Sequence, residues 1–134
     1  MKQQRLRILI CDTEVETLLD LEQTLEDAGF DTTTTWNARD VARLLETDLF
    51  HLLIMGNHPP QMDAEVILRG LRAKDRRGCD VPSLVLLQDL TEYEMERLRS
   101  AGAKSVVSRR DHASIVEQVQ RCLRDLLGDV RKAG

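Results

Sequence analysis

The sequence predicts an α/β fold in which a mostly parallel five-stranded sheet is covered by helices on both faces. Short apolar runs alternate along the chain with longer segments whose apolar residues recur at helical spacing. The helical segments also carry start and stop signals, and no linker interrupts the alternation. Because right-handed crossovers place helices on both sides of a parallel sheet, this pattern predicts one doubly wound domain, a three-layer sandwich of five strand–helix units.

Two strands and two helices are predicted in the first part of the chain. Leu6–Cys11 is an apolar run interrupted only by Arg7, which is typical of a strand buried on both faces. The helix that follows ends where Gly29 can form a left-handed cap. Phe30–Thr35 is the second strand, and its run of threonines gives β-propensity with little apolar surface, as at a sheet edge. Asn37 can cap the second helix.

The second half begins with the strand Leu52–Met55 and a helix capped by Asp63. Val81–Leu87 is the fourth strand, and Thr91 starts the fourth helix with a capping box that Glu94 completes. The remaining signals are Gly102 as the cap of that helix, Ser105–Val107 as a short fifth strand, Asp111 at the start of the last helix and Gly128 at its end. With the second strand at an edge, the elements fit the flavodoxin-like strand order 2-1-3-4-5, in which functional groups gather at the carboxyl ends of the strands.

Composition and charge exclude several function classes. The formal net charge of −4 argues against direct nucleic-acid binding, which depends on clustered Lys and Arg. No apolar run approaches the roughly 20 residues that span a bilayer, so we expect no membrane association. Met1–Arg5 lacks the apolar core of a secretory signal, and the cytoplasm is the expected location. The isolated Cys11, Cys79 and Cys122 predict inert thiols, without a disulfide or zinc site.

Four segments at the predicted strand ends and turns carry specific motifs. They are Arg7–Glu14 with its acidic strand end, Leu52–Ala64 with a Pro-x-Met-Asp loop, Val81–Leu87, and the Ala-Gly-Ala turn of Ala101–Lys104. Together these motifs resemble the CheY-like receiver domain of two-component response regulators. The resemblance covers about residues 5–127, and residues 128–134 are expected to be a polar tail or the start of a linker.

The resemblance implies a phosphorylation site, most of which is replaced in this sequence. Ordinary receivers phosphorylate an aspartate at the end of strand three, with Mg²⁺ held by carboxylates, a hydroxyl after strand four and a lysine after strand five. The matching positions hold Gly56 for the acceptor, Thr13 for the second acid beside Asp12, Leu87 for the hydroxyl and Arg109 for the lysine. We therefore expect Mg²⁺ binding to be weak or absent, no other cofactor, and no enzymatic activity.

Two further features agree with a degenerate receiver, or pseudo-receiver. Asp12 and Arg109 are expected to form a salt bridge in place of the lost acceptor and lysine pair. Val106 stands where receivers usually carry an aromatic switch residue in strand five, and its stiffness and small size leave little to switch. These replacements predict a module that works independently of phosphorylation.

The resemblance also implies an interaction face formed by the fourth helix, the fifth strand and the last helix. We expect this face to present Leu90, Tyr93, Arg97, Val106 and Arg110. Exposed aromatic and arginine residues are enriched at binding hot spots. The expected role is signal transduction, through a protein partner or a homodimer formed on this face.

Two other function classes stay open. One is a phosphoaccepting receiver that uses His58 or Glu14, although the simplest reading of His58 is an exposed, unassisted loop residue. The other is a small-ligand sensor in the crevice over the strand ends. Glu14 or Asp89 could also approach the metal site, or Glu14 could be a solvated first-turn acid.

A basic run at the end of the third helix is expected mainly to complement the helix dipole. It consists of Arg69, Arg72, Lys74, Arg76 and Arg77.

Overall fold

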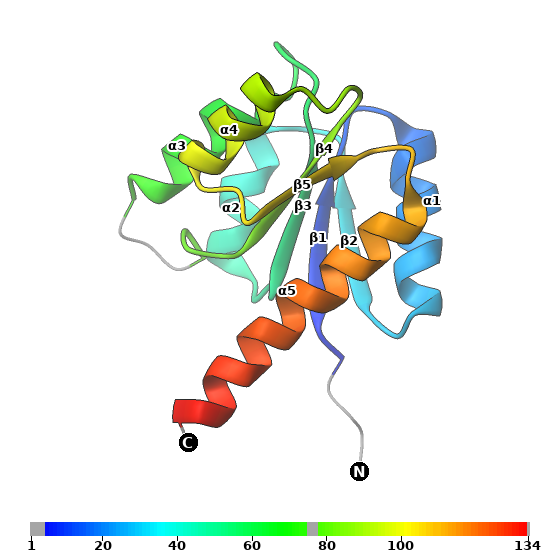
Figure 1. The fold of residues 1–134 in the computed structure, drawn as a ribbon, viewed down its shortest axis with the longest axis vertical. Helices are drawn as coiled ribbons and strands as arrows, with labels where there is room; N and C mark the ends of the chain where they lie inside the picture. The colour runs from blue at the N-terminus through cyan, green and yellow to red at the C-terminus, as the bar shows by residue number, and fades with distance from the viewer. Residues whose placement is uncertain (1–4, 75–77, 134) are drawn as a thin grey trace.

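The computed structural model of the chain describes residues 5–74 and 78–133, with side chains as far as residue 125. The elements are β1 (Arg7–Cys11), α1 (Val15–Asp27), β2 (Asp31–Thr35), α2 (Arg39–Thr47), β3 (Leu52–Gly56), α3 (Ala64–Arg72), β4 (Ser83–Leu87), α4 (Glu92–Ala101), β5 (Ser105–Ser108) and α5 (His112–Ala133). Figure 1 shows the sheet between two helical layers, with α1 and α5 on one side and α2, α3 and α4 on the other.

The sheet confirms the predicted topology. Its strands are all parallel and follow the order β2-β1-β3-β4-β5. The threonine-rich β2 is an edge strand, as predicted, and it pairs only with β1 in the described sheet. Cys11 pairs with Met55 and Leu87 pairs with Ser108, so the residues that follow these strands meet at one edge of the sheet.

Two apolar layers fill the space between the sheet and the helices. One layer joins the odd-numbered residues of β1 to α2, α3 and α4, and the other joins the even-numbered residues to α1 and α5. The central strands β3 and β4 are buried along their whole length. This two-sided burial explains why their sequences are continuous apolar runs rather than alternating patterns.

The three cysteines are buried and unpaired. Burial is the main cause that raises the pKa of the Cys11 thiol, and the neighbouring Asp12 carboxylate raises it further. A thiol in this environment stays protonated and is a poor nucleophile. Within residues 5–74 and 78–133, no helix combines the length and the apolar character needed to cross a membrane.

Most of the predicted helix caps are present. Asp63 accepts the backbone N–H of Val66 at 3.2 Å, and Thr91 accepts that of Glu94 at 3.2 Å. Gly102 ends α4 with a φ of 115°, a conformation that favours glycine. Asn37 caps the second helix as predicted, because its Oδ1 accepts the Arg39 backbone N–H at 3.0 Å, although Ala38 is the residue directly before the helix.

The last helix does not end at Gly128, so that prediction is wrong. Helix α5 continues to Ala133, and residues 128–133 of the expected tail are therefore helical. A glycine inside a helix costs about 1 kcal/mol relative to alanine, which weakens a helix without ending it. In Figure 1 the last turns of α5 extend past the sheet.

Arg72 lies in the last turn of α3, as the dipole prediction requires, and its side chain also turns inward. Its guanidinium donates to the carbonyl oxygens of Cys79 at 2.6 Å, Val81 at 2.9 Å and Gly102 at 3.1 Å, and to the Ser83 hydroxyl at 3.2 Å. Burial lowers the pKa of this guanidinium. Arg72 therefore ties the segment before β4 to the turn before β5.

The rest of the basic run lies at the surface where it is described. Arg69 pairs with Glu65 at 3.1 Å, one turn away in α3, and Lys74 is exposed. Arg76 and Arg77 lie outside the described residues.

Replacing Arg72 with alanine is expected to lower the free energy of unfolding by about 2 kcal/mol, because half-buried carbonyl groups lose their donors. Urea unfolding followed by far-UV circular dichroism measures the change. Arg69→Ala is the matched control, since an exposed i,i+4 pair contributes about 0.5 kcal/mol or less. Equal losses in the two variants would contradict a structural role for Arg72.

Candidate functional site

Asp12, Gly56 and Arg109 meet at the carboxyl edge of the sheet. Asp12 follows β1, Gly56 is the last residue of β3, and Arg109 follows β5. The Arg109 backbone N–H donates to the Leu87 carbonyl at 3.0 Å, which continues the β4–β5 ladder and fixes the start of its side chain. Asp12 is fully buried, and Arg109 is only 8% exposed.

The predicted salt bridge between Asp12 and Arg109 is present. Arg109 Nη2 lies 3.4 Å from Asp12 Oδ2 and 3.3 Å from Glu14 Oε1. The same nitrogen donates to the Thr17 hydroxyl at 3.0 Å. One buried guanidinium therefore joins the ends of β1 and β5 to the first turn of α1. Glu14 is not simply a solvated first-turn acid, because it pairs with Arg109.

His58 belongs to the same cluster, so the prediction that it is exposed and unassisted is wrong. Its Nε2 lies 2.8 Å from Asp12 Oδ1 and 2.7 Å from Arg109 Nη1, and its side chain is 19% exposed. Two backbone hydrogen bonds between His58 and Met62, at 2.7 and 2.8 Å, close the loop that holds the imidazole there. When Nε2 carries a proton it donates to Asp12, and when it does not it accepts from Arg109.

Gly56 makes room for this arrangement. A Cβ atom added at Gly56 would lie 2.1 Å from Asp12 Oδ2 and 2.7 Å from Asp12 Cγ. Asp12 is also held by the Glu14 backbone N–H, which donates to Oδ1 at 2.8 Å. The Asp12 carboxylate therefore fills the space that a side chain at position 56 would need.

The remaining predicted site positions are Leu87, Val106, Thr13 and Asp89. Leu87 and Val106 are buried in the apolar layer under α2, α3 and α4. Thr13 is partly buried, and Asp89 is exposed. In the part of the chain that the structure describes, no three His, Cys, Asp or Glu side chains are arranged to hold a metal ion.

The predicted interaction face is only partly assembled as expected. Arg97 forms a double salt bridge to Glu65 of α3, with two N–O distances of 2.9 Å, and its Nη1 donates to the Tyr93 hydroxyl at 3.0 Å. Arg97 is the main cause that lowers the pKa of Glu65. Tyr93 and Arg97 are therefore tied to α3 rather than to β5. Val106 is buried, so it adds no exposed surface to the face.

Exposed apolar side chains remain around α4. Tyr93 is 69% exposed and Leu90 is 49% exposed, while Arg110 is also at the surface. On another flank of α4, an open hollow of about 480 Å³ is lined by Glu92, Met95, Glu96 and Arg99. The sequence reasoning missed these four residues, although their spacing along one helix could have indicated a shared flank.

The fold of this chain matches the folds of solved structures. A CheY-like response regulator receiver domain from Methanospirillum hungatei aligns with a TM-score of 0.82 at 17% identity, covering 94% of this chain and 99% of that one. The chain has the fold of a response regulator receiver. An orphan response regulator of H. pylori aligns with a TM-score of 0.75 at 18% identity, covering 90% and 99% of the two chains. No protein-family model and no curated protein matches the sequence.

Another receiver-fold structure comes from a signal transduction histidine kinase of Syntrophus aciditrophicus. It aligns with a TM-score of 0.77 at 22% identity, covering 89% of this chain and 90% of that one.

The residues present in this receiver fold do not fit a magnesium ion at the carboxyl edge. Mg²⁺ needs several oxygen ligands with free lone pairs in a near-octahedral arrangement. Asp12 has both carboxylate oxygens within 3.5 Å of Arg109 Nη2, and Oδ1 also faces His58 and the Glu14 N–H. A second cation at Asp12 would have to displace the Arg109 guanidinium.

Proposed function

We propose that this chain is a pseudo-receiver of a signal-transduction protein, which works without phosphorylation as a protein-interaction or dimerisation module. The observation that carries the proposal is the position of the Asp12 carboxylate. It occupies the space beside Gly56 and is held by Arg109 and His58. A phosphoacceptor needs free space for the incoming phosphoryl group and nearby cations to neutralise its charge. Here the Asp12 carboxylate occupies the space, and Arg109 and His58 already bind Asp12.

The proposed interaction surface is centred on α4. Tyr93 and Leu90 expose apolar area there, and Arg97 is pre-oriented by Glu65. An aromatic side chain held by a neighbouring arginine loses little freedom on binding, which favours its use as an anchor. The hollow beside Met95 offers a partner side chain a place to insert.

Incubation with a small phosphodonor and Mg²⁺ is expected to leave two masses unchanged. The intact mass stays that of the unmodified chain, because no acceptor carboxylate is present at position 56. The mass in solution, measured by light scattering at several concentrations, stays the same with and without the donor. An ordinary receiver treated in parallel shows that the donor is active.

A stoichiometric phosphoryl adduct would contradict the proposal. His58→Gln and Glu14→Gln variants then identify its acceptor. Loss of the adduct in one of them would support the alternative of a receiver with a non-standard phosphoacceptor, for which the proximity of His58 to Arg109 is the favourable observation. Samples are kept near neutral pH, because a phosphohistidine is lost in acid.

A further inference from the structure

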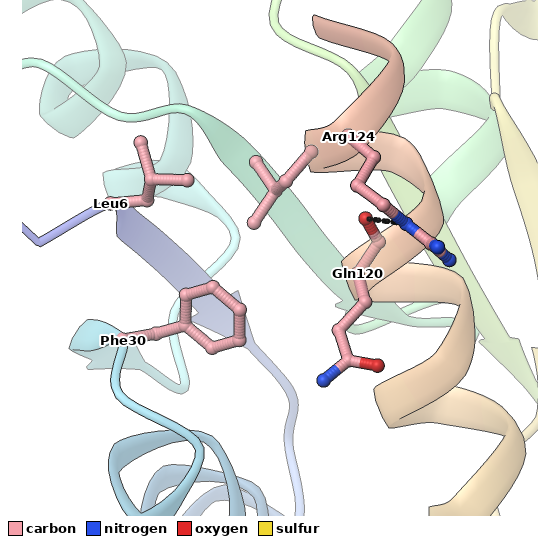
Figure 2. A pocket seen from close by; sticks show the side chains of 5 residues that line it. Leu6, Phe30, Gln120 and Arg124 are labelled. Carbon is pink, nitrogen blue, oxygen red and sulfur yellow. Dashed lines mark hydrogen bonds between the residues drawn. The ribbon is translucent and has the colours of Figure 1, made fainter. Parts of the chain in front are cut away.

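An apolar pocket opens at the amino edge of the sheet, opposite the Asp12 cluster. Leu6 directly precedes β1, Phe30 directly precedes β2, and the facing wall comes from α5. The cavity is about 310 Å³, near the lower end of the roughly 300–1,000 Å³ of small-molecule sites. Figure 2 shows Leu6 and Phe30 on one side of the opening, with Gln120 and Arg124 projecting from α5 on the other.

The walls of the pocket are continuous with the protein core. Leu6 and Phe30 are partly buried and pack against the apolar layer under α1 and α5, and Leu123 belongs to that layer with 2% exposure. The Phe30 ring and the Leu6 methyl groups that line the opening remain partly accessible to water. A hydrocarbon chain placed here would remove that surface from water, which is favourable.

The rim of the pocket carries a positive charge that has no salt-bridge partner among the residues whose side chains the structure describes. Arg124 Nε donates to the Gln120 backbone carbonyl at 3.4 Å, the dashed line in Figure 2. Among the described residues, no carboxylate lies within salt-bridge distance of Arg124. Its neighbours on α5 differ, because Arg121 pairs with Glu117 at 3.3 Å and Asp125 pairs with Lys104 at 3.7 Å. The Arg124 guanidinium is therefore available to an anion.

We propose that this pocket binds a small aliphatic carboxylate. The hydrocarbon chain lies between Phe30 and Leu123, and the carboxylate accepts hydrogen bonds from Arg124 at the rim. A guanidinium matches a carboxylate through two parallel N–H···O bonds, which a primary amine or an alcohol cannot accept in the same way. The pocket lies at the opposite end of the strands from the crevice at the carboxyl edge of the sheet, and the proposal does not depend on the proposed function.

Octanoate is a suitable probe, and the chain offers an internal control. The chain contains only two phenylalanines, Phe30 and Phe50. Phe50 is buried in the other apolar layer, under α2, α3 and α4. With fluorine-labelled phenylalanine, titration with octanoate is expected to shift the Phe30 resonance saturably and leave the Phe50 resonance in place. Arg124→Gln is expected to weaken binding about tenfold, because a charge-assisted pair is lost. Arg121→Gln, on the same helix, is expected to leave the affinity unchanged.

Three results would overturn the proposal. The first is the absence of a saturable Phe30 shift at octanoate concentrations well below micelle formation. The second is equal binding of octylamine and octanoate, which would show that the rim does not select an anion. The third is a Phe30 shift that follows protein concentration without any ligand, which would assign the groove to a second copy of the chain.

Discussion

Replacing Arg109 with alanine is expected to lower the free energy of unfolding by about 3 kcal/mol, the largest effect expected within the Asp12 cluster. The loss arises because Asp12 is fully buried and Arg109 supplies its cationic partner. Removing one member of a buried pair leaves the other charge without compensation, which costs far more than losing a surface pair. His58 remains as a second partner at 2.8 Å, so the fold is expected to persist. Urea unfolding at neutral pH measures the change.

Arg110→Ala is the matched control for Arg109→Ala. Arg110 follows directly in the chain but is exposed, so its removal is expected to change the stability by no more than about 0.5 kcal/mol. Arg109→Lys keeps the charge but loses the fork that reaches Asp12, Thr17 and His58, and an intermediate loss is expected. If the stability of Arg109→Ala matched that of Arg110→Ala, the cluster would not be a structural element.

Gly56→Ala is expected to cost about 2–3 kcal/mol, although alanine adds only one methyl group. The added carbon would lie 2.1 Å from Asp12 Oδ2, which is far inside any allowed contact. Asp12 has a short side chain and cannot move away without loosening its contacts to Arg109, His58 and the Glu14 N–H. Gly56→Ala therefore either introduces a steric clash with Asp12 or breaks the contacts that hold Asp12.

A double-mutant cycle separates this cause from a general effect of alanine. In an Asp12→Ala background the clashing atoms are absent, so adding Gly56→Ala is expected to cost less than about 1 kcal/mol more. Gly70→Ala is the control for glycine chemistry, because a Cβ at this helical position meets no atom within 4 Å. It is expected to stabilise the protein by about 0.5–1 kcal/mol. Additive costs for Asp12→Ala and Gly56→Ala would rule out the steric explanation.

The strand order and most helix ends could be predicted because their signals are local. A buried strand is a continuous apolar run, an edge strand is polar, and a cap such as Asp63 or Thr91 acts within three residues. The end of α5 could not be predicted in this way, because a local signal can be outweighed by its surroundings. A single Gly128 is a weak local signal, and it does not outweigh the helix around it.

The salt bridge of Asp12 and Arg109 could also be predicted, because topology alone brings the ends of β1 and β5 to one edge of the sheet. The inward position of His58 could not. It depends on how the loop closes between His58 and Met62, and on the Asp12 carboxylate that occupies the space beside Gly56. The direction of Arg97 could not be predicted either. Its side chain lies against α3 because it pairs with Glu65 there.

By itself, the sequence determined the α/β fold, the polar edge strand and the set of residues at the carboxyl edge, because periodicity and capping act between near neighbours. Only the tertiary structure decided which of those side chains meet. Asp12 turns into the space beside Gly56, Arg72 turns into a ring of carbonyl groups, and Leu6 and Phe30 leave an opening against α5. These outcomes depend on side-chain direction and on packing between residues far apart in the chain, which no local pattern encodes.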